Sequence, residues 1–166
     1  LHLGRPQFAF RAFLGLKTSW LSREILGFSI FAGLATFYAA MFWLPQIENL
    51  IGFELPSFLK SESLRLQVSV AVAISGILGV ICSVMVYDDC KKELWRGSIT
   101  GLKFFGTTIV LGLSTIALAS LGGVYFLKPE YAGEVAKVYS ANLAILIIIA
   151  SFAKMAWEAA IFRHLK

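Results

Sequence analysis

Four long stretches of this chain carry almost no charge, and charged residues gather between them. Each stretch is long enough to cross the hydrocarbon core of a bilayer, which takes about 20 residues of helix. A soluble helix would instead interleave charged residues with apolar ones at helical spacing. The pattern therefore predicts four transmembrane helices, at about residues 25–47, 66–87, 104–127 and 138–158.

Residues 1–24 differ from these stretches because basic residues alternate there with aromatic and aliphatic ones. The segment is too charged to span a membrane, and its composition is typical of a segment that lies at the membrane surface. We expect Ser22 to cap the helix that follows. Pro45 is expected to end that first helix.

The second predicted helix is rich in small residues, which allow a neighbouring helix to approach closely. The same abundance is an ordinary property of membrane helices, so both interpretations stay open. In the fourth predicted helix, Lys154 and Glu158 are four residues apart and are expected to pair near water. The small residues are Ala71, Ala73, Ser75, Gly76 and Gly79.

Composition agrees with a membrane protein. Hydrophobic residues make up 58% of the 166 residues and charged residues 15%, whereas about a quarter of a soluble protein is charged. The length leaves room for one membrane domain, residues 1–166, and no second globular domain. We predict an all-α polytopic bundle, and we expect the chain to be an internal piece of a longer protein.

Basic residues outnumber acidic ones and give a formal net charge of +5. They flank the predicted spans and form no separate basic domain, which argues against nucleic-acid binding. Lys and Arg are frequent before the first span, in residues 88–103 and at the C-terminus, and sparse in the other two connections. By the positive-inside rule, the frequent segments face the cytoplasm.

Motifs of soluble enzymes are absent: the sequence has no phosphate loop and no dinucleotide fingerprint. The histidines, His2 and His164, lie at opposite ends of the chain. Cys82 and Cys90 are eight residues apart, roughly 12 Å along a helix, which is too far for a disulfide. We therefore expect no protein-bound metal cluster in this chain, and no catalysis by the chain alone.

His2 and Glu24 could serve quinol chemistry. Quinol oxidation releases two protons with two electrons, so it needs proton acceptors at the edge of a helix bundle. Structural roles are the alternatives: a polar residue at the interface for His2, and for Glu24 the neutralisation of Arg23 or a favourable place near a helix N-terminus.

Two segments resemble the membrane anchor subunit of the dimethyl sulfoxide reductase family. The first is LHLGRPQFAFRAFLGLKTSWLSREILGFSIFAG, with the family's H-L-G-x-P segment and its S-W-L-S-R-E-like approach to a span. The second is VMVYDDCKKELWRGSITGLKFFGTTIVLG, which is similar to the family's tyrosine-ended helix and the T-x-L-x-F-F-G-T-like opening of the next. The resemblance covers roughly the first 115 residues. The loops ENLIGFELPSFLKSES and DDCKKELWRG match no family pattern, so the exact partner and substrate stay open.

The resemblance implies an anchor of eight spans, of which this chain would be the third to the sixth. Such an anchor oxidises menaquinol and passes electrons to an iron–sulfur subunit, which feeds a molybdopterin catalytic subunit. It holds no haem. By position in the matching motifs, His2 and Glu24 are the expected quinol-binding residues. We expect a basic surface to dock the iron–sulfur subunit, formed by Arg5, Arg11, Lys17 and Arg23, whose alternative role is contact with lipid headgroups.

The leading interpretation is an anchor of a respiratory oxidoreductase in a bacterial or archaeal plasma membrane. The alternatives are a small transporter, against which the first three spans carry no charged residue at mid-membrane, and a purely structural anchor without a quinone site. Family members with exported catalytic subunits place the H-L-G-x-P face outside, whereas the charge distribution places it inside. The sequence therefore leaves the side of the membrane undecided.

Overall fold

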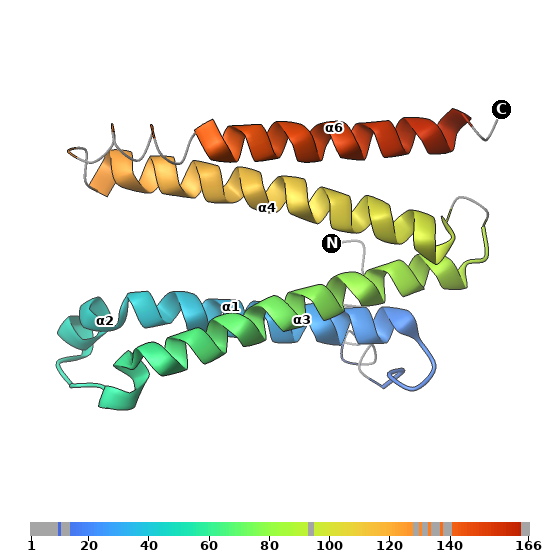
Figure 1. Cartoon of the computed structure of the whole chain (residues 1–166). Helices are drawn as coiled ribbons and strands as arrows, with labels where there is room; N and C mark the ends of the chain where they lie inside the picture. The colour runs from blue at the N-terminus through green and yellow to red at the C-terminus, as the bar shows by residue number, and fades with distance from the viewer. Residues whose placement is uncertain are drawn as a thin grey trace. The chain divides into compact units, whose positions relative to one another are not determined.

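The structure, a computed structural model, describes residues 10, 14–92, 95–127, 130, 133, 137 and 141–163. Its elements are helical (Figure 1). In chain order they are α1 (Trp20–Phe42), α2 (Leu44–Ile51), the short 3-10 helix η2 (Ser57–Lys60), α3 (Glu62–Asp89), α4 (Gly97–Leu127) and α6 (Ala141–Arg163).

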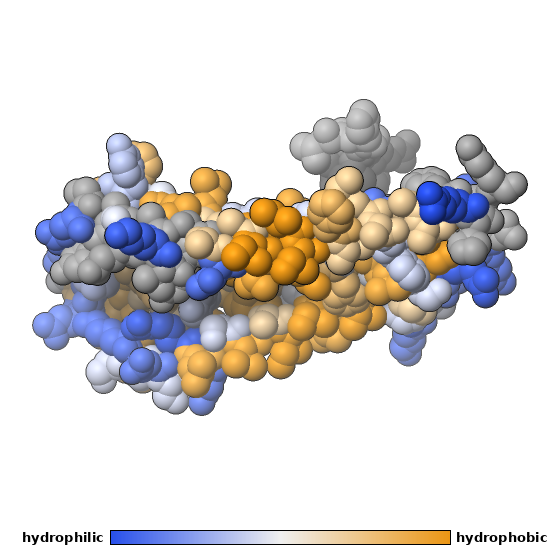
Figure 2. Space-filling view, turned by 45° about the horizontal axis from the view of Figure 1, so that its top comes forward, coloured by the Kyte–Doolittle hydropathy of each residue, from blue (hydrophilic) through white to orange (hydrophobic). Residues whose placement is uncertain are grey.

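Among the described residues, four helices are long and apolar enough to cross a membrane: α1, α3, α4 and α6. Their large apolar side chains point outward, and Leu118 on α4 and Phe152 on α6 are 76% and 74% exposed. Figure 2 shows hydrophobic residues along the middle of the helices and hydrophilic residues toward their ends. A soluble protein would bury such surfaces. The all-α fold with four spans is confirmed, and the chain is a multi-pass membrane protein.

The chain divides into two compact units, residues 1–97 and 98–166. In the first, α1 and α3 lie side by side along most of their lengths (Figure 1). At one end of this pair, Met41, Leu44 and Val68 form a small buried core. Partly buried side chains pack around it: Tyr38, Leu55, Leu59, Leu64 and Val72. The second unit contains α4 and α6.

Each of these four helices continues into charged residues at one end or both. The first helix begins at Trp20 because Ser19, not Ser22, is its N-cap: the Ser19 Oγ accepts a hydrogen bond from the Ser22 N–H. The assignment of the cap to Ser22 was wrong. The helix ends at Phe42, and Pro45 lies in the first turn of the separate helix α2. Proline is tolerated there because an N–H in the first turn has no hydrogen-bond partner within the helix.

Residues 44–60 form a folded connection outside the spans. The Glu48 carboxylate accepts a hydrogen bond of 2.7 Å from the Leu55 N–H and lies 2.8 Å from the Lys60 Nζ. Gly52, at φ 65°, turns the chain between these partners. The ammonium group of Lys60, followed by the Leu55 N–H, lowers the pKa of Glu48 from its ordinary value of 4.5. One carboxylate thus joins α2, the loop after it and η2.

This connection is expected to loosen in acid. Because the pKa of Glu48 is lower in the folded chain, its stabilising contribution is present above pH 4.5 and is lost as the pH falls through the lowered pKa. The Leu55 amide proton resonance should therefore titrate with a midpoint below 4.5. Glu48→Gln should abolish this titration and speed amide exchange at Leu55, whereas Glu54→Gln, an exposed carboxylate in the same loop, should change neither. Unchanged exchange in Glu48→Gln would contradict this role.

Candidate functional site

Glu24 lies near the start of α1 and is joined to α3. Its Oε1 accepts a hydrogen bond of 2.5 Å from the Ser83 Oγ, and the Ser83 hydroxyl also lies 3.3 Å from the Gly79 carbonyl oxygen. Ser83 is buried at 7% exposure, and Glu24 is partly buried. The carboxylate is therefore held in one orientation at the contact between two spans.

Close packing of α1 on α3 produces this contact. The two helices approach so closely that a Cβ built on Gly27 would lie 3.4 Å from the Gly79 Cα. Rings from α1 cover the glycines of α3: a Cβ on Gly79 would lie 3.0 Å from the Phe28 ring, and one on Gly76 3.2 Å from the Phe31 ring. The prediction of close helix approach is confirmed for Gly76 and Gly79.

Ser83 continues the same stripe. Ser75, Gly79 and Ser83 are spaced by four residues on α3, and all three are buried. Sequence reasoning recognised the first two as small residues and missed Ser83 as the partner of Glu24. The available signal was the four-residue spacing, which places Ser83 on the packed face of the helix.

Arg23 fixes the segment before α1. Its Nε donates a hydrogen bond of 2.8 Å to the Leu16 carbonyl oxygen, and one terminal nitrogen donates one of 2.9 Å to the Lys17 carbonyl oxygen. The guanidinium carbon lies 4.2 Å from the centroid of the Trp20 ring. Arg23 therefore folds residues 14–18 onto the beginning of α1, while Lys17 is exposed. Arg5, Arg11 and His2 lie outside the described residues.

The other predicted polar groups also have places in the structure. Lys154 and Glu158 on α6 form the expected ion pair, with 2.9 Å between the Nζ and Oε1. Cys82 and Cys90 are free thiols. Within the part of the chain that the structure describes, no three His, Cys, Asp or Glu side chains gather as a metal site would require. Among the predicted site residues that the structure describes, Glu24 is thus the carboxylate that joins α1 to α3.

The chain is similar in sequence to a known protein family and to a curated protein. Residues 1–152 match the family model described as the DMSO reductase anchor subunit (DmsC). The chain is 34% identical over 104 residues to a sulfite dehydrogenase subunit of Allochromatium vinosum. That alignment covers 62% of this chain and 31% of the relative, so the chain spans about a third of the relative's length. No solved structure matches the chain.

Proposed function

The chain belongs to the DMSO reductase anchor subunit (DmsC) family, and we propose that it is the quinol-oxidising membrane anchor of a respiratory molybdenum oxidoreductase. The chain would then be the central part of an eight-span anchor in a bacterial or archaeal plasma membrane. Its partners would be an iron–sulfur subunit and a molybdopterin catalytic subunit, which hold the redox cofactors of the complex.

The observation that carries the proposal is the position of Glu24. Burying a carboxylate at the end of a membrane span costs free energy unless the carboxylate is hydrogen-bonded. Carboxylates that are kept at such positions often have a function. Here the Ser83 hydroxyl donates a hydrogen bond to one oxygen atom of Glu24, and the second oxygen can accept hydrogen bonds as well, because both carboxylate oxygens are acceptors. This second oxygen is the one that we assign to the quinol.

The proposed reaction converts one menaquinol into one menaquinone, two protons and two electrons. His2 bonds the quinol oxygen and accepts one proton; Glu24 accepts the other, or organises the site so that water takes it. The iron–sulfur subunit takes the electrons. The test is oxidation of a reduced menaquinone analogue by the purified complex, because a purely structural anchor predicts that the quinol stays reduced.

The names of the matched family and relative limit how far the proposal extends. One is the name of a reductase subunit and the other that of a dehydrogenase subunit. The proposal is therefore confined to the quinol half-reaction and to the presence of the two partner subunits, and it commits to no terminal substrate.

We also propose that the basic residues before α1 dock the iron–sulfur subunit. These residues are Arg5, Arg11, Lys17 and Arg23. Their roles differ, since the guanidinium group of Arg23 holds the turn at Leu16 and Lys17, whereas the side chain of Lys17 is exposed. Arg23 would shape the surface and Lys17 would contact the partner directly.

Lys17→Glu is expected to weaken retention of the iron–sulfur subunit several-fold at low salt. The reason is that a negative side chain would replace a positive one that attracts the partner at the rim of the interface. The difference from wild type should shrink as salt screens the charges. Pull-down of the partner across a salt series measures this. Lys137→Glu, the same change at an exposed lysine between α4 and α6, is the control, and equal losses in both variants would contradict the docking role.

The side of the membrane can be read from Cys90, which is exposed at the end of α3. Labelling of Cys90 by an impermeant maleimide in intact cells would place this face outside. Protection in cells, with labelling after the membrane is opened, would place it in the cytoplasm. Cys82 lies within the span, so Cys82→Ala provides a single-cysteine chain for the measurement.

A further inference from the structure

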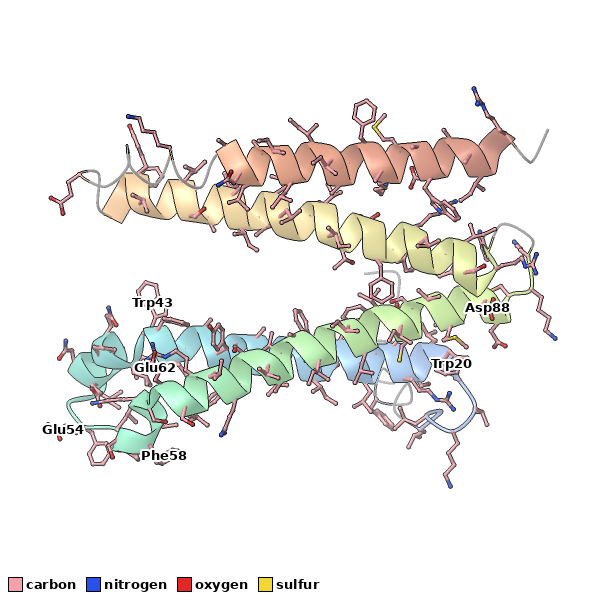
Figure 3. All side chains as sticks on the ribbon, viewed as in Figure 1. Trp20, Trp43, Glu54, Phe58, Glu62 and Asp88 are labelled. Carbon is pink, nitrogen blue, oxygen red and sulfur yellow. The ribbon has the colours of Figure 1, made fainter. Side chains whose placement is uncertain are left out.

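A cavity of about 480 Å³ lies between the beginning of α1 and the end of α3. Figure 3 shows Trp20 and Asp88 at this end of the two helices, away from the end that carries Trp43 and Glu62. Trp20 and Met85 provide its apolar lining. A tryptophan at the end of a membrane span usually lies at the level of the lipid headgroups. The cavity is therefore positioned where headgroups meet protein.

Three cations line the same cavity: Lys91, Lys92 and Arg96. They follow α3 directly in the sequence, so the end of one span and the connection after it concentrate positive charge at this point.

Lys91 has a backbone conformation that is unusual for its residue type. Its φ of 52° is in the left-handed region, and it directly follows Cys90, the C-cap of α3. Glycine is the usual residue at that position, because a Cβ is disfavoured there. A lysine in this place keeps a positive charge at the cavity despite the backbone strain, which is a pattern that points to function.

Two carboxylates, Asp88 and Asp89, also line the cavity. The Asp88 Oδ1 accepts a hydrogen bond of 2.5 Å from the Gly97 N–H, the first residue of α4. Its charge is thereby placed at a helix N-terminus, where the helix dipole favours it. The cavity is lined by three cations and two carboxylates, so its net charge is positive.

We propose that this cavity binds the phosphate headgroup of an anionic phospholipid. Lys91, Lys92 and Arg96 supply the positive charge that the phosphate requires, and basic pockets between spans are typical binding places for such headgroups. Trp20 and Met85 offer apolar contact to the glycerol and the upper acyl chains. The source of the phosphate is a lipid, because the walls of the cavity are the ends of two membrane spans. The site does not depend on His2 or Glu24.

The test measures lipids that stay bound to the full chain, with its partners, after exchange from membranes containing equal phosphatidylglycerol and phosphatidylcholine. Mass spectrometry counts both lipids. Wild type should retain phosphatidylglycerol preferentially. Lys91→Gly should lower this preference roughly fivefold, and Lys92→Gln with Arg96→Gln should lower it more, because each basic residue near a membrane surface contributes attraction of that order.

Two controls separate the lipid site from unfolding and from a general effect of positive charge. Lys91→Gly removes a cation and relieves an unfavourable backbone conformation, so lost binding cannot be attributed to unfolding if the melting temperature is unchanged or raised. Arg163→Gln removes a positive charge outside the cavity and should keep the lipid preference. The proposal is overturned if wild type shows no preference for phosphatidylglycerol, if Arg163→Gln loses as much, or if inorganic phosphate alone displaces the lipid at equal concentration.

Discussion

Glu24→Gln is expected to lower quinol-dependent turnover of the assembled complex by about 10²-fold or more, the usual range for loss of a proton-transferring group. Glutamine keeps the size of the side chain and an oxygen that can still accept the hydrogen bond from Ser83. The loss would therefore come from the missing proton acceptor and not from altered packing. His2→Ala should act in the same direction.

The control for this series separates chemistry from assembly. An artificial reductant that feeds the iron–sulfur subunit directly should support normal turnover in Glu24→Gln. Glu62→Gln, which changes an exposed carboxylate at the start of α3, should leave quinol turnover unchanged. Ser83→Ala, which removes the donor and keeps the carboxylate, should have a smaller effect, about tenfold. Wild-type quinol turnover in both Glu24→Gln and His2→Ala would contradict the assigned site.

Gly79→Leu is expected to separate α1 from α3. A Cβ alone at this position would lie 3.0 Å from the Phe28 ring, and a Cβ on Gly27 would lie 3.4 Å from the Gly79 Cα. Overpacking of this kind costs about 1–3 kcal/mol. Because Ser83 is one turn further along α3, the contact between Ser83 and Glu24 should also be lost, and quinol turnover should fall with stability. Thermal unfolding in mild detergent, together with turnover, measures both effects.

Gly33→Leu is the matched control. A Cβ on Gly33, in α1, would meet no atom within 4 Å, so a leucine there does not press α1 away from α3. This variant should unfold at the wild-type temperature and keep its turnover. If both leucine variants behaved alike, the close approach of Gly27 and Gly79 would not be what holds the site.

The four spans could be predicted because lipid imposes a simple rule: long uncharged helices cross the membrane. The exact helix ends could not, because a helix continues into charged residues wherever a cap or a surface contact allows it. Glu62 begins α3 within a charged segment, since the Ser61 Oγ accepts a hydrogen bond from the Leu64 N–H. The hydropathy of the sequence does not show where such a cap forms.

The candidate site was predictable in part. Glu24 was predicted from a family motif, whereas its hydrogen-bond partner Ser83 was not predicted. A serine in a membrane helix normally bonds a carbonyl of its own helix, as Ser29, Ser114 and Ser120 do here. Ser83 also bonds Glu24 on another helix, and that pairing depends on how α3 is rotated against α1. Such rotation is decided by packing and cannot be read from a single sequence.

Whether the chain is a quinol-oxidising anchor can be tested by purification from native membranes in mild detergent, followed by fluorescence titration with a menaquinol analogue and mass spectrometry of the co-purifying subunits. A quinol-oxidising anchor should bring an iron–sulfur and a molybdopterin subunit into the preparation and should bind the analogue saturably, with weaker binding in Glu24→Gln. A chain that purifies without these partners and binds no analogue would contradict this function.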